Sequence, residues 1–216
     1  VYDPQTDGWQ PLAKMTTARC ALGLAAAGGK IYAIGGSAGE RVDSLALASV
    51  EAFDPQLGSW TLVASMSVQR KHPIAVVLDG LDDKFYVIGG LGHADGTLDI
   101  VEVYDAQADS WQQLASMPQR LCYHSAAAMG GKIYVTGGFN QAFTVDSVCV
   151  YDPQTDTWTQ LASMSTARRA HASAAVGGKL YVFGGRTSGG TMLDTVEVYD
   201  PASNSWAQVA RMTSMR

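Results

Sequence analysis

The sequence predicts an all-β fold built from repeated four-stranded units. The phrase GGKIYAIGG at residues 28–36 returns as DDKFYVIGG at 82–90, GGKIYVTGG at 130–138 and GGKLYVFGG at 177–185. Each copy is a short apolar run between turn residues, which is typical of a buried β-strand. A second pattern follows each copy: an aromatic residue, a Trp seven positions later and a Met six positions after the Trp. Two patterns that recur together indicate a repeat architecture.

The second pattern occurs five times with both spacings unchanged. The aromatic, the Trp and the Met are Tyr2, Trp9 and Met15; Phe53, Trp60 and Met66; Tyr104, Trp111 and Met117; Tyr151, Trp158 and Met164; and Tyr199, Trp206 and Met212. An Arg follows each Met by three or four residues, at Arg19, Arg70, Arg120, Arg168 and Arg216. A double glycine, a Tyr and a Trp that recur about every 50 residues resemble the kelch repeat. The resemblance covers essentially the whole chain and implies a β-propeller of four-stranded antiparallel blades.

The repeats divide the chain into one domain over residues 1–216. We expect a half repeat at 1–15 and full repeats at about 16–66, 67–117, 118–164 and 165–212. This gives about 18 strands, four in each of four blades and two in the half blade. Because kelch rings commonly hold six blades, we expect the chain to be a segment of a longer ring. The alternative is a ring that closes with four blades and a spare hairpin.

Each repeat contains four strands in order. The first strands, such as SAAAM, are rich in small residues, which suit sheets that converge on a central axis. The second strands are the glycine-bounded phrases, and the third strands read VEAF, VEVY, VCVY and VEVY. The fourth strands carry the Trp among polar residues and are expected at the solvent-exposed rim. Between the third and fourth strands, sequences such as Asp54-Pro55 predict turns, because Asp accepts hydrogen bonds from the next amides and Pro presets φ.

The connections between second and third strands vary in length, and variable loops on a rigid scaffold usually carry function. The resemblance implies that these loops, together with the fourth-to-first connections, line one face around the channel mouth. Candidate partner-binding residues follow the glycines or lie beside the repeated Arg, at Ser37, Lys71, His72, Leu91, His93, Tyr123, Phe139, Asn140, Arg169, Arg186 and Thr187.

Other recurring polar residues are expected to be structural. The repeated Arg occurs in every unit, which favours a hydrogen-bonding role in each blade. The same reasoning applies to the residues at matching repeat positions Asp99, Asp146, Asp194, His124 and His171. In the first unit Ala48 occupies the Asp position, and Asp43 is displaced by an apparent insertion.

Composition limits the classes of partner and cofactor. The net charge is −5 and no run of Lys or Arg occurs, so we expect neither nucleic acid nor a membrane as partner. Cys20, Cys122 and Cys149 are odd in number and form no metal-binding spacing, which favours thiols in the reducing cytoplasm. Hydrolase, metalloprotease and phosphate-loop motifs are absent, and the four histidines lack ligand spacing. We therefore expect no cofactor, no metal and no catalytic residue.

The resemblance implies a non-enzymatic protein-interaction module. The chain looks most like the substrate-recognition domain of BTB-kelch ubiquitin-ligase adaptors. One alternative is a kelch-type enzyme, either a carbohydrate mutarotase or an oxidase. Another is an actin or cytoskeletal scaffold. We also expect self-association through open blade edges, because unpaired strand edges invite pairing with another copy.

Overall fold

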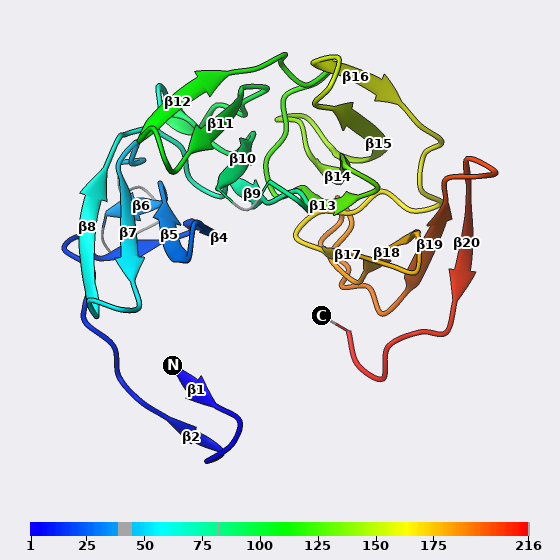
Figure 1. The fold of residues 1–216 in the computed structure, drawn as a ribbon. Coiled ribbons are helices and arrows are strands. Elements are labelled where there is room, and N and C mark those ends of the chain that lie inside the picture. Colours follow the sequence, from blue (N-terminus) through cyan, green and yellow to red (C-terminus); the bar gives the residue numbers. More distant parts are fainter. Residues whose placement is uncertain (39–44, 82, 216) are drawn as a thin grey trace.

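In the computed structural model, residues 1–38, 45–81 and 83–215 are described. They form four four-stranded antiparallel sheets arranged around an open arc, with an N-terminal hairpin at one end (Figure 1). This confirms the prediction of an all-β fold made of propeller blades. Asp43 and Arg216, which the repeats singled out, lie outside the described residues.

The blades follow the chain from the inner to the outer strand. Blade 1 consists of β4 (Gly23–Ala27), β5 (Lys30–Ile34), β7 (Val50–Asp54) and β8 (Ser59–Val63). Blade 2 consists of β9 (Ile74–Val76), β10 (Lys84–Ile88), β11 (Val101–Asp105) and β12 (Ser110–Gln113). Blade 3 consists of β13 (Ser125–Met129), β14 (Lys132–Phe139), β15 (Thr144–Asp152) and β16 (Thr157–Gln160). Blade 4 consists of β17 (Ala172–Val176), β18 (Lys179–Phe183), β19 (Val196–Asp200) and β20 (Ser205–Val209).

The remaining elements are short. The N-terminal hairpin pairs β1 (Tyr2–Asp3) with β2 (Gly8–Trp9). A pairing absent from the predicted strand set joins β3 (Arg19–Cys20) to β6 (Ser37–Ala38) at the loop end of blade 1. A 3-10 turn, η1, covers His93–Asp95. Among the described residues, no helix is long and apolar enough to span a membrane.

The predicted turns between third and fourth strands have the expected hydrogen bonds. Asp54 Oδ1 accepts the N–H of Gln56 at 2.9 Å, and Asp152 accepts that of Gln154 at the same distance. Asp105, which Ala106 follows in place of Pro, still accepts the N–H of Gln107 at 3.0 Å. The Asp is therefore sufficient for this turn without the Pro.

The core lies between successive blades rather than within one sheet. The first apolar residue of the second strand is fully buried in three blades, at Phe85, Ile133 and Leu180. Its counterpart in blade 1, Ile31, is 39% exposed. The N-terminal hairpin precedes blade 1 with two strands only, so the inner half of this face stays uncovered (Figure 1).

The repeated Trp fastens each blade to the one before it. The indole N–H of Trp111 donates to the carbonyl of Ala64 in blade 1 at 2.8 Å. The N–H of Ala64 donates in turn to Asp109 at 2.7 Å, and the Tyr104 hydroxyl donates to the same carboxylate oxygen. We call this arrangement of Trp, Asp or Asn, and Tyr on an Ala the seam clamp. It recurs in the next two seams with Trp158, Asp156 and Tyr151 on Ala115, and with Trp206, Asn204 and Tyr199 on Ala162.

The seam between the N-terminal hairpin and blade 1 has only part of the clamp. Trp60 donates to the carbonyl of Ala13 at 2.9 Å, as in the other seams. Phe53 stands where the other blades have Tyr, and Gly58 stands where they have Asp or Asn. Both replacements occur together, so this seam lacks the hydroxyl and the carboxylate. The Trp hydrogen bond is the part of the clamp that remains.

The Asp position before the third strand acts through its backbone. The carbonyl of Asp99 accepts the N–H of Met117 at 2.9 Å, and that of Asp146 accepts Met164 at 3.0 Å. In blade 1 the carbonyl of Ala48 accepts Met66 in the same way. The structural role expected at this position is confirmed, and a backbone role explains why Ala48 can replace the Asp.

Candidate functional site

The loop face is built by short backbone pairings between segments far apart in the sequence. In each blade, the residue that follows the repeated Arg position pairs with the residue that follows the glycine pair. The pairs are Cys20 with Ser37, Lys71 with Leu91, Cys122 with Phe139, and Arg169 with Arg186. The connections from fourth to first strand and those from second to third strand, which the sequence predicts to share one surface, are therefore paired with each other in every blade.

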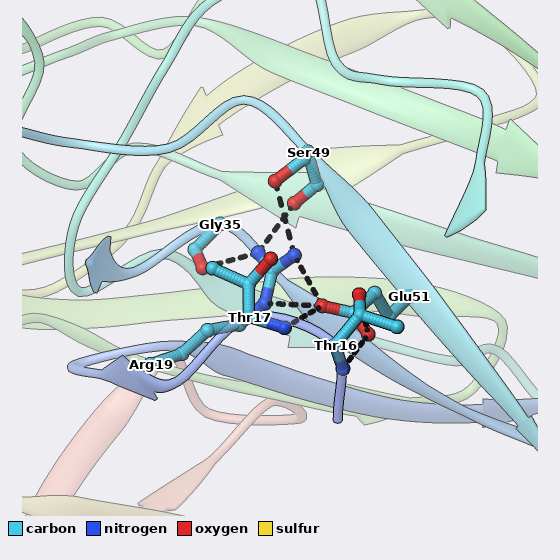
Figure 2. Close-up of polar contacts among 6 residues, drawn as sticks. All are labelled: Thr16, Thr17, Arg19, Gly35, Ser49 and Glu51. Atoms are coloured by element: carbon cyan, nitrogen blue, oxygen red, sulfur yellow. Dashed lines mark hydrogen bonds and ion pairs between the residues drawn. The ribbon is translucent and has the colours of Figure 1, made fainter. Parts of the chain in front are cut away.

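A buried ion pair supports this face from below. In blade 1, Arg19 donates to the carbonyls of Gly35 and Ser49 at 3.0 and 2.8 Å and to Glu51 at 2.9 Å (Figure 2). Thr16 donates to the same carboxylate. Burial alone would raise the pKa of the Glu51 carboxyl, but the hydrogen bonds from Thr16 and Arg19 outweigh it and hold the pKa at about 2.

The same pair recurs as Arg70 with Glu102 in blade 2 and Arg168 with Glu197 in blade 4, all fully buried. Each guanidinium also donates to the carbonyl of the first glycine after the second strand, as Arg168 does to Gly184 at 2.9 Å. The Arg therefore fixes the point where the hairpin enters the loop face. The expected structural role is confirmed in these three blades.

Blade 3 departs from the prediction, because Arg120 does not occupy the repeated position. Its side chain is 66% exposed and lies 3.7 Å from Asp99. Leu121 fills the Arg position, with its carbonyl against Gly89 as the Arg70 carbonyl lies against Gly35. Cys149 replaces the Glu, and both side chains are buried. Replacing both partners by apolar groups leaves no buried charge uncompensated.

The next residue in each blade has a left-handed backbone at the inner edge of the face. Ala21, His72, Tyr123 and Ala170 have φ of 53°, 50°, 53° and 51°. The N–H of His72 donates to Ala21 in the preceding blade at 2.7 Å, and that of Ala170 donates to Tyr123 at 2.8 Å. The rings of His72 and Tyr123 lie 4.6 Å apart. Non-glycine residues rarely adopt this conformation, so its recurrence shows that the blade-to-blade hydrogen bonds hold the inner edge.

Three predicted residues gather between blades 3 and 4. Arg169 and Arg186 exchange both backbone hydrogen bonds, each 3.0 Å, so their side chains leave directly opposite positions. The Arg169 guanidinium lies 5.0 Å from the centre of the Phe139 ring. In the described part of the chain, neither Arg forms an ion pair. We call Phe139, Arg169 and Arg186 the arginine cluster.

The other predicted residues differ in how much of each side chain they present. Ser37 and Lys71 are buried, so they contribute to the face mainly through their backbone. The side chain of Asn140 accepts the N–H groups of Ala142 and Phe143 at 3.1 and 3.0 Å, which is a turn-capping role.

Leu91 pairs with Lys71 and is half-buried, whereas His93 is exposed in η1. Thr187 is half-buried, and its N–H donates to the carbonyl of Thr191 across the blade 4 loop at 3.0 Å. Within this set, side chains meet in the arginine cluster and in the His72–Tyr123 pair.

Sequence reasoning missed an exposed aromatic residue on this face. Phe143, at the tip of the blade 3 hairpin, is 61% exposed. The hairpin is braced on one side by Gln141, which lies 3.4 Å from Thr97 of blade 2. On the other side the N–H of Thr144 donates to Ser188 of blade 4 at 3.1 Å. An aromatic residue inside the polar loop FNQAFTVDS was the available signal.

The two repeated histidines lie between blades. His171 Nε2 is 2.9 Å from Thr136 Oγ1 of blade 3, and His124 is buried against Gly89 of blade 2. Burial lowers the pKa of His124 to about 4. Burial and the nearby Arg168 lower the pKa of His171 to about 3. Both stay neutral near pH 7 and act as packing residues, as expected for repeat positions. Across the described ranges, no three His, Cys, Asp or Glu side chains come together as metal ligands would.

Comparison with known proteins identifies the repeat. A family model described as the KLHDC2/KLHL20/DRC7 Kelch-repeats domain matches residues 21–215. Kelch-like protein 23 of Pongo abelii is 31% identical over 138 residues, 64% of this chain and 23% of that protein. Kelch-like protein 36 of Mus musculus is 32% identical over 128 residues, 58% of this chain and 20% of that protein. Kelch-like protein 7 of Rattus norvegicus is 37% identical over 101 residues, 47% of this chain and 17% of that protein.

The matched region is thus about a fifth of the length of these relatives. Within the chain, the family model spans all four blades described above. The repeated strands, the glycine pairs and the Trp clamps agree with this match. The chain therefore belongs to the kelch-repeat family.

Proposed function

We propose that the chain is a protein-interaction module that recognises a partner protein through its loop face. The observation that carries the proposal is the arginine cluster. Like charges at directly opposite positions of paired strands destabilise the pairing. Arg169 and Arg186 occupy such positions without a carboxylate partner in the described residues. A negative group supplied by a partner would relieve this repulsion.

The cluster favours a carboxylate-bearing side chain or chain end as the group that is bound. Arg binds carboxylates through two parallel N–H groups, and such bonds are stronger than neutral ones. Phe139 holds the Arg169 guanidinium by ring contact, so less side-chain freedom is lost on binding. Arg and aromatic residues are also enriched among the residues that dominate binding energy.

The rest of the face supplies apolar contact. Phe143 and Met192 are exposed on the loops of blades 3 and 4, and Met192 pairs with Arg186 of the cluster. His72 and Tyr123 add a second aromatic contact toward blade 2. A partner segment that places an acidic residue on the cluster and an apolar residue on Phe143 fits this arrangement.

An adaptor role, as in the BTB-kelch class, extends this proposal. In that role the loop face would select the protein that is modified, and other domains would supply the ligase. For this role we predict a cytoplasmic location. Cys20, Cys122 and Cys149 form no disulfide in the structure.

Affinity capture from cell extract, followed by mass spectrometry, tests the proposal. We expect Arg186→Ala to reduce the yield of a captured protein at least about tenfold, since a lost charged contact of about 1.5 kcal/mol has that effect. The matched control is Lys179→Ala, which removes an exposed cation at the opposite end of β18 and should leave capture unchanged. Equal capture by the wild type and Arg186→Ala would contradict the proposal.

A second pair of variants separates binding from folding. Arg169→Ala should reduce capture with little change in melting temperature, because the side chain makes its ring contact on the loop face. Arg168→Ala should lower the melting temperature, because it leaves Glu197 buried without its partner. If both variants lost stability equally and kept capture, Arg169 would have no binding role.

A further inference from the structure

Ser188 lies at the tip of the hairpin that joins β18 to β19, on the loop face. The N–H of Gly190 donates to the carbonyl of Thr187 at 3.0 Å, which closes a four-residue turn around Ser188. The residue is exposed, and glycines occupy the next two positions. An enzyme can therefore reach its hydroxyl without opening a blade.

The Ser188 hydroxyl is bonded to the loop of blade 3. Its Oγ accepts the N–H of Thr144 at 3.1 Å. Thr144 is the register partner of Phe139, and the Arg169 guanidinium lies 5.0 Å from the centre of the Phe139 ring. A group attached to Ser188 Oγ would thus lie one hydrogen bond away from the residue that faces Phe139.

Both arginines of the cluster lie near this hydroxyl. Arg186 precedes Ser188 by two residues, so their Cα atoms are at most about 7 Å apart. Arg186 exchanges both backbone hydrogen bonds with Arg169, so the second guanidinium leaves the position directly opposite. Two long side chains can therefore reach a group on Ser188 Oγ.

The charge around this hydroxyl is positive. The blade 3 segment 139–145 and the blade 4 segment 184–193 contain no Asp or Glu. Asp194, the next acidic residue in blade 4, is paired with Arg211 at 3.0 Å. Since the two arginines of the cluster have no ion-pair partner among the described residues, an anion on Ser188 would meet two guanidinium groups and no competing carboxylate on these loops.

We propose that Ser188 is a phosphorylation site whose phosphate pairs with Arg169 and Arg186 and closes the arginine cluster. A protein kinase would transfer the γ-phosphoryl group of ATP to Ser188 Oγ. The bond from that phosphorus to the bridging oxygen breaks and ADP leaves, a bond to Oγ forms, and the hydroxyl proton passes to a base of the kinase. The phosphate brings about 1.5 to 2 negative charges and three strong acceptor oxygens.

A phosphate matches the groups that the two loops offer. Guanidinium groups bind phosphate through parallel N–H groups, so Arg169 and Arg186 can each contribute a charge-assisted bond. The Thr144 N–H, which donates to the hydroxyl oxygen in the unmodified chain, can donate to a phosphate oxygen instead. The regulatory consequence rests on the proposed function: the phosphate and a partner's carboxylate compete for the same two guanidinium groups, so phosphorylation releases the partner.

Phosphorus NMR tests the pairing without any partner. Phosphoserine is incorporated at position 188 of the chain during translation, and the phosphate is titrated. We expect its second pKa to fall to about 5, against about 6 for a free phosphoserine, because nearby guanidinium groups favour the dianion. Arg169→Ala and Arg186→Ala should each return the value toward 6.

The matched control is phosphoserine at Ser203, an exposed residue in the blade 4 turn whose N–H donates to Asp200. Its phosphate lies beside a carboxylate and should titrate at about 6 or above. A second pKa of about 6 at position 188, unchanged in the Arg169→Ala and Arg186→Ala variants, would overturn the pairing.

Two further measurements test the modification and its consequence. Incubation with cell extract and ATP, followed by mass spectrometry, should place a phosphate on Ser188, and its absence there would overturn the phosphorylation site. In affinity capture, the protein phosphorylated at Ser188 should retain at least about tenfold less partner than the unmodified protein, whereas phosphate at Ser203 should have no effect. Equal capture with and without phosphate on Ser188 would contradict the regulatory consequence. If the unmodified protein captures nothing, the proposed function fails, and the titration still decides whether the phosphate pairs with the arginines.

Discussion

Replacing Arg70 and Glu102 of blade 2 by Leu and Cys, the residues at the same positions in blade 3, tests how the buried ion pair supports the loop face. In blade 2, Arg70 and Glu102 are 0% and 1% exposed, and Arg70 also donates to the carbonyls of Gly89 and Ile100 at 3.2 and 3.1 Å. Either Arg70→Leu or Glu102→Cys leaves a buried charge without its partner. Each single variant should therefore lower the free energy of unfolding by about 3–5 kcal/mol.

The double variant should be less damaging than the sum of the two. It removes both charges, so the remaining cost comes from the carbonyls of Gly89 and Ile100, each of which loses a donor at about 1–3 kcal/mol. We expect a total loss of about 2–6 kcal/mol, below the sum of about 6–10 kcal/mol for the two single losses, and the difference is the coupling between Arg70 and Glu102. The blade 3 pair of Leu121 and Cys149 is the natural precedent for this exchange.

Urea unfolding of the wild type, the two single variants and the double variant measures the coupling. Lys84→Ala is the control, because it breaks an exposed ion pair with Asp105 in the same blade and should leave the midpoint almost unchanged. Additive losses in the double variant would refute the reasoning, since they would mean that Arg70 and Glu102 stabilise the blade independently.

Further outcomes follow from the seams. Trp158→Ala should lower the free energy of unfolding by about 2–4 kcal/mol, because it removes a half-buried ring and its hydrogen bond to Ala115. Trp9→Ala should change the unfolding midpoint little, because that ring is exposed. Equal losses for the two variants in thermal unfolding would contradict the seam clamp. Stability should change little between about pH 7 and pH 8 and fall as the pH decreases from about 6.5 toward 4, because the unfolded chain binds protons that buried His124 and His171 reject. His124→Leu should weaken this dependence in urea midpoints taken between pH 7.5 and 4.5, and an unchanged slope would exclude His124 as a cause.

The fold was predictable because its pattern is local and repeated. The glycine-bounded strands and the aromatic–Trp–Met spacing lie within short segments, and five agreeing copies made the period plain. The partners of the Trp could not be read in this way. The bond from Trp111 to Ala64 joins residues on different blades, and only the stacking of sheets brings them together.

The candidate face was predicted as a surface but not in detail. Spacing placed Arg120 with the repeated Arg, yet an offset of one residue turns that side chain outward and brings Leu121 inward. The burial of Lys71 could not be predicted either. It depends on its pairing with Leu91 from a distant loop, and no local pattern describes that contact.

The incomplete clamp at Phe53 and Gly58 sets the order in which the molecule opens. In an array where each unit touches only its neighbours, stability is a sum over units and interfaces, and the weakest interface separates first. The N-terminal hairpin should therefore exchange its amide hydrogens fastest and be the first site that a protease cuts. Blades 1 to 4, joined to one another by three full clamps, would then open together as one cooperative unit at higher free energy.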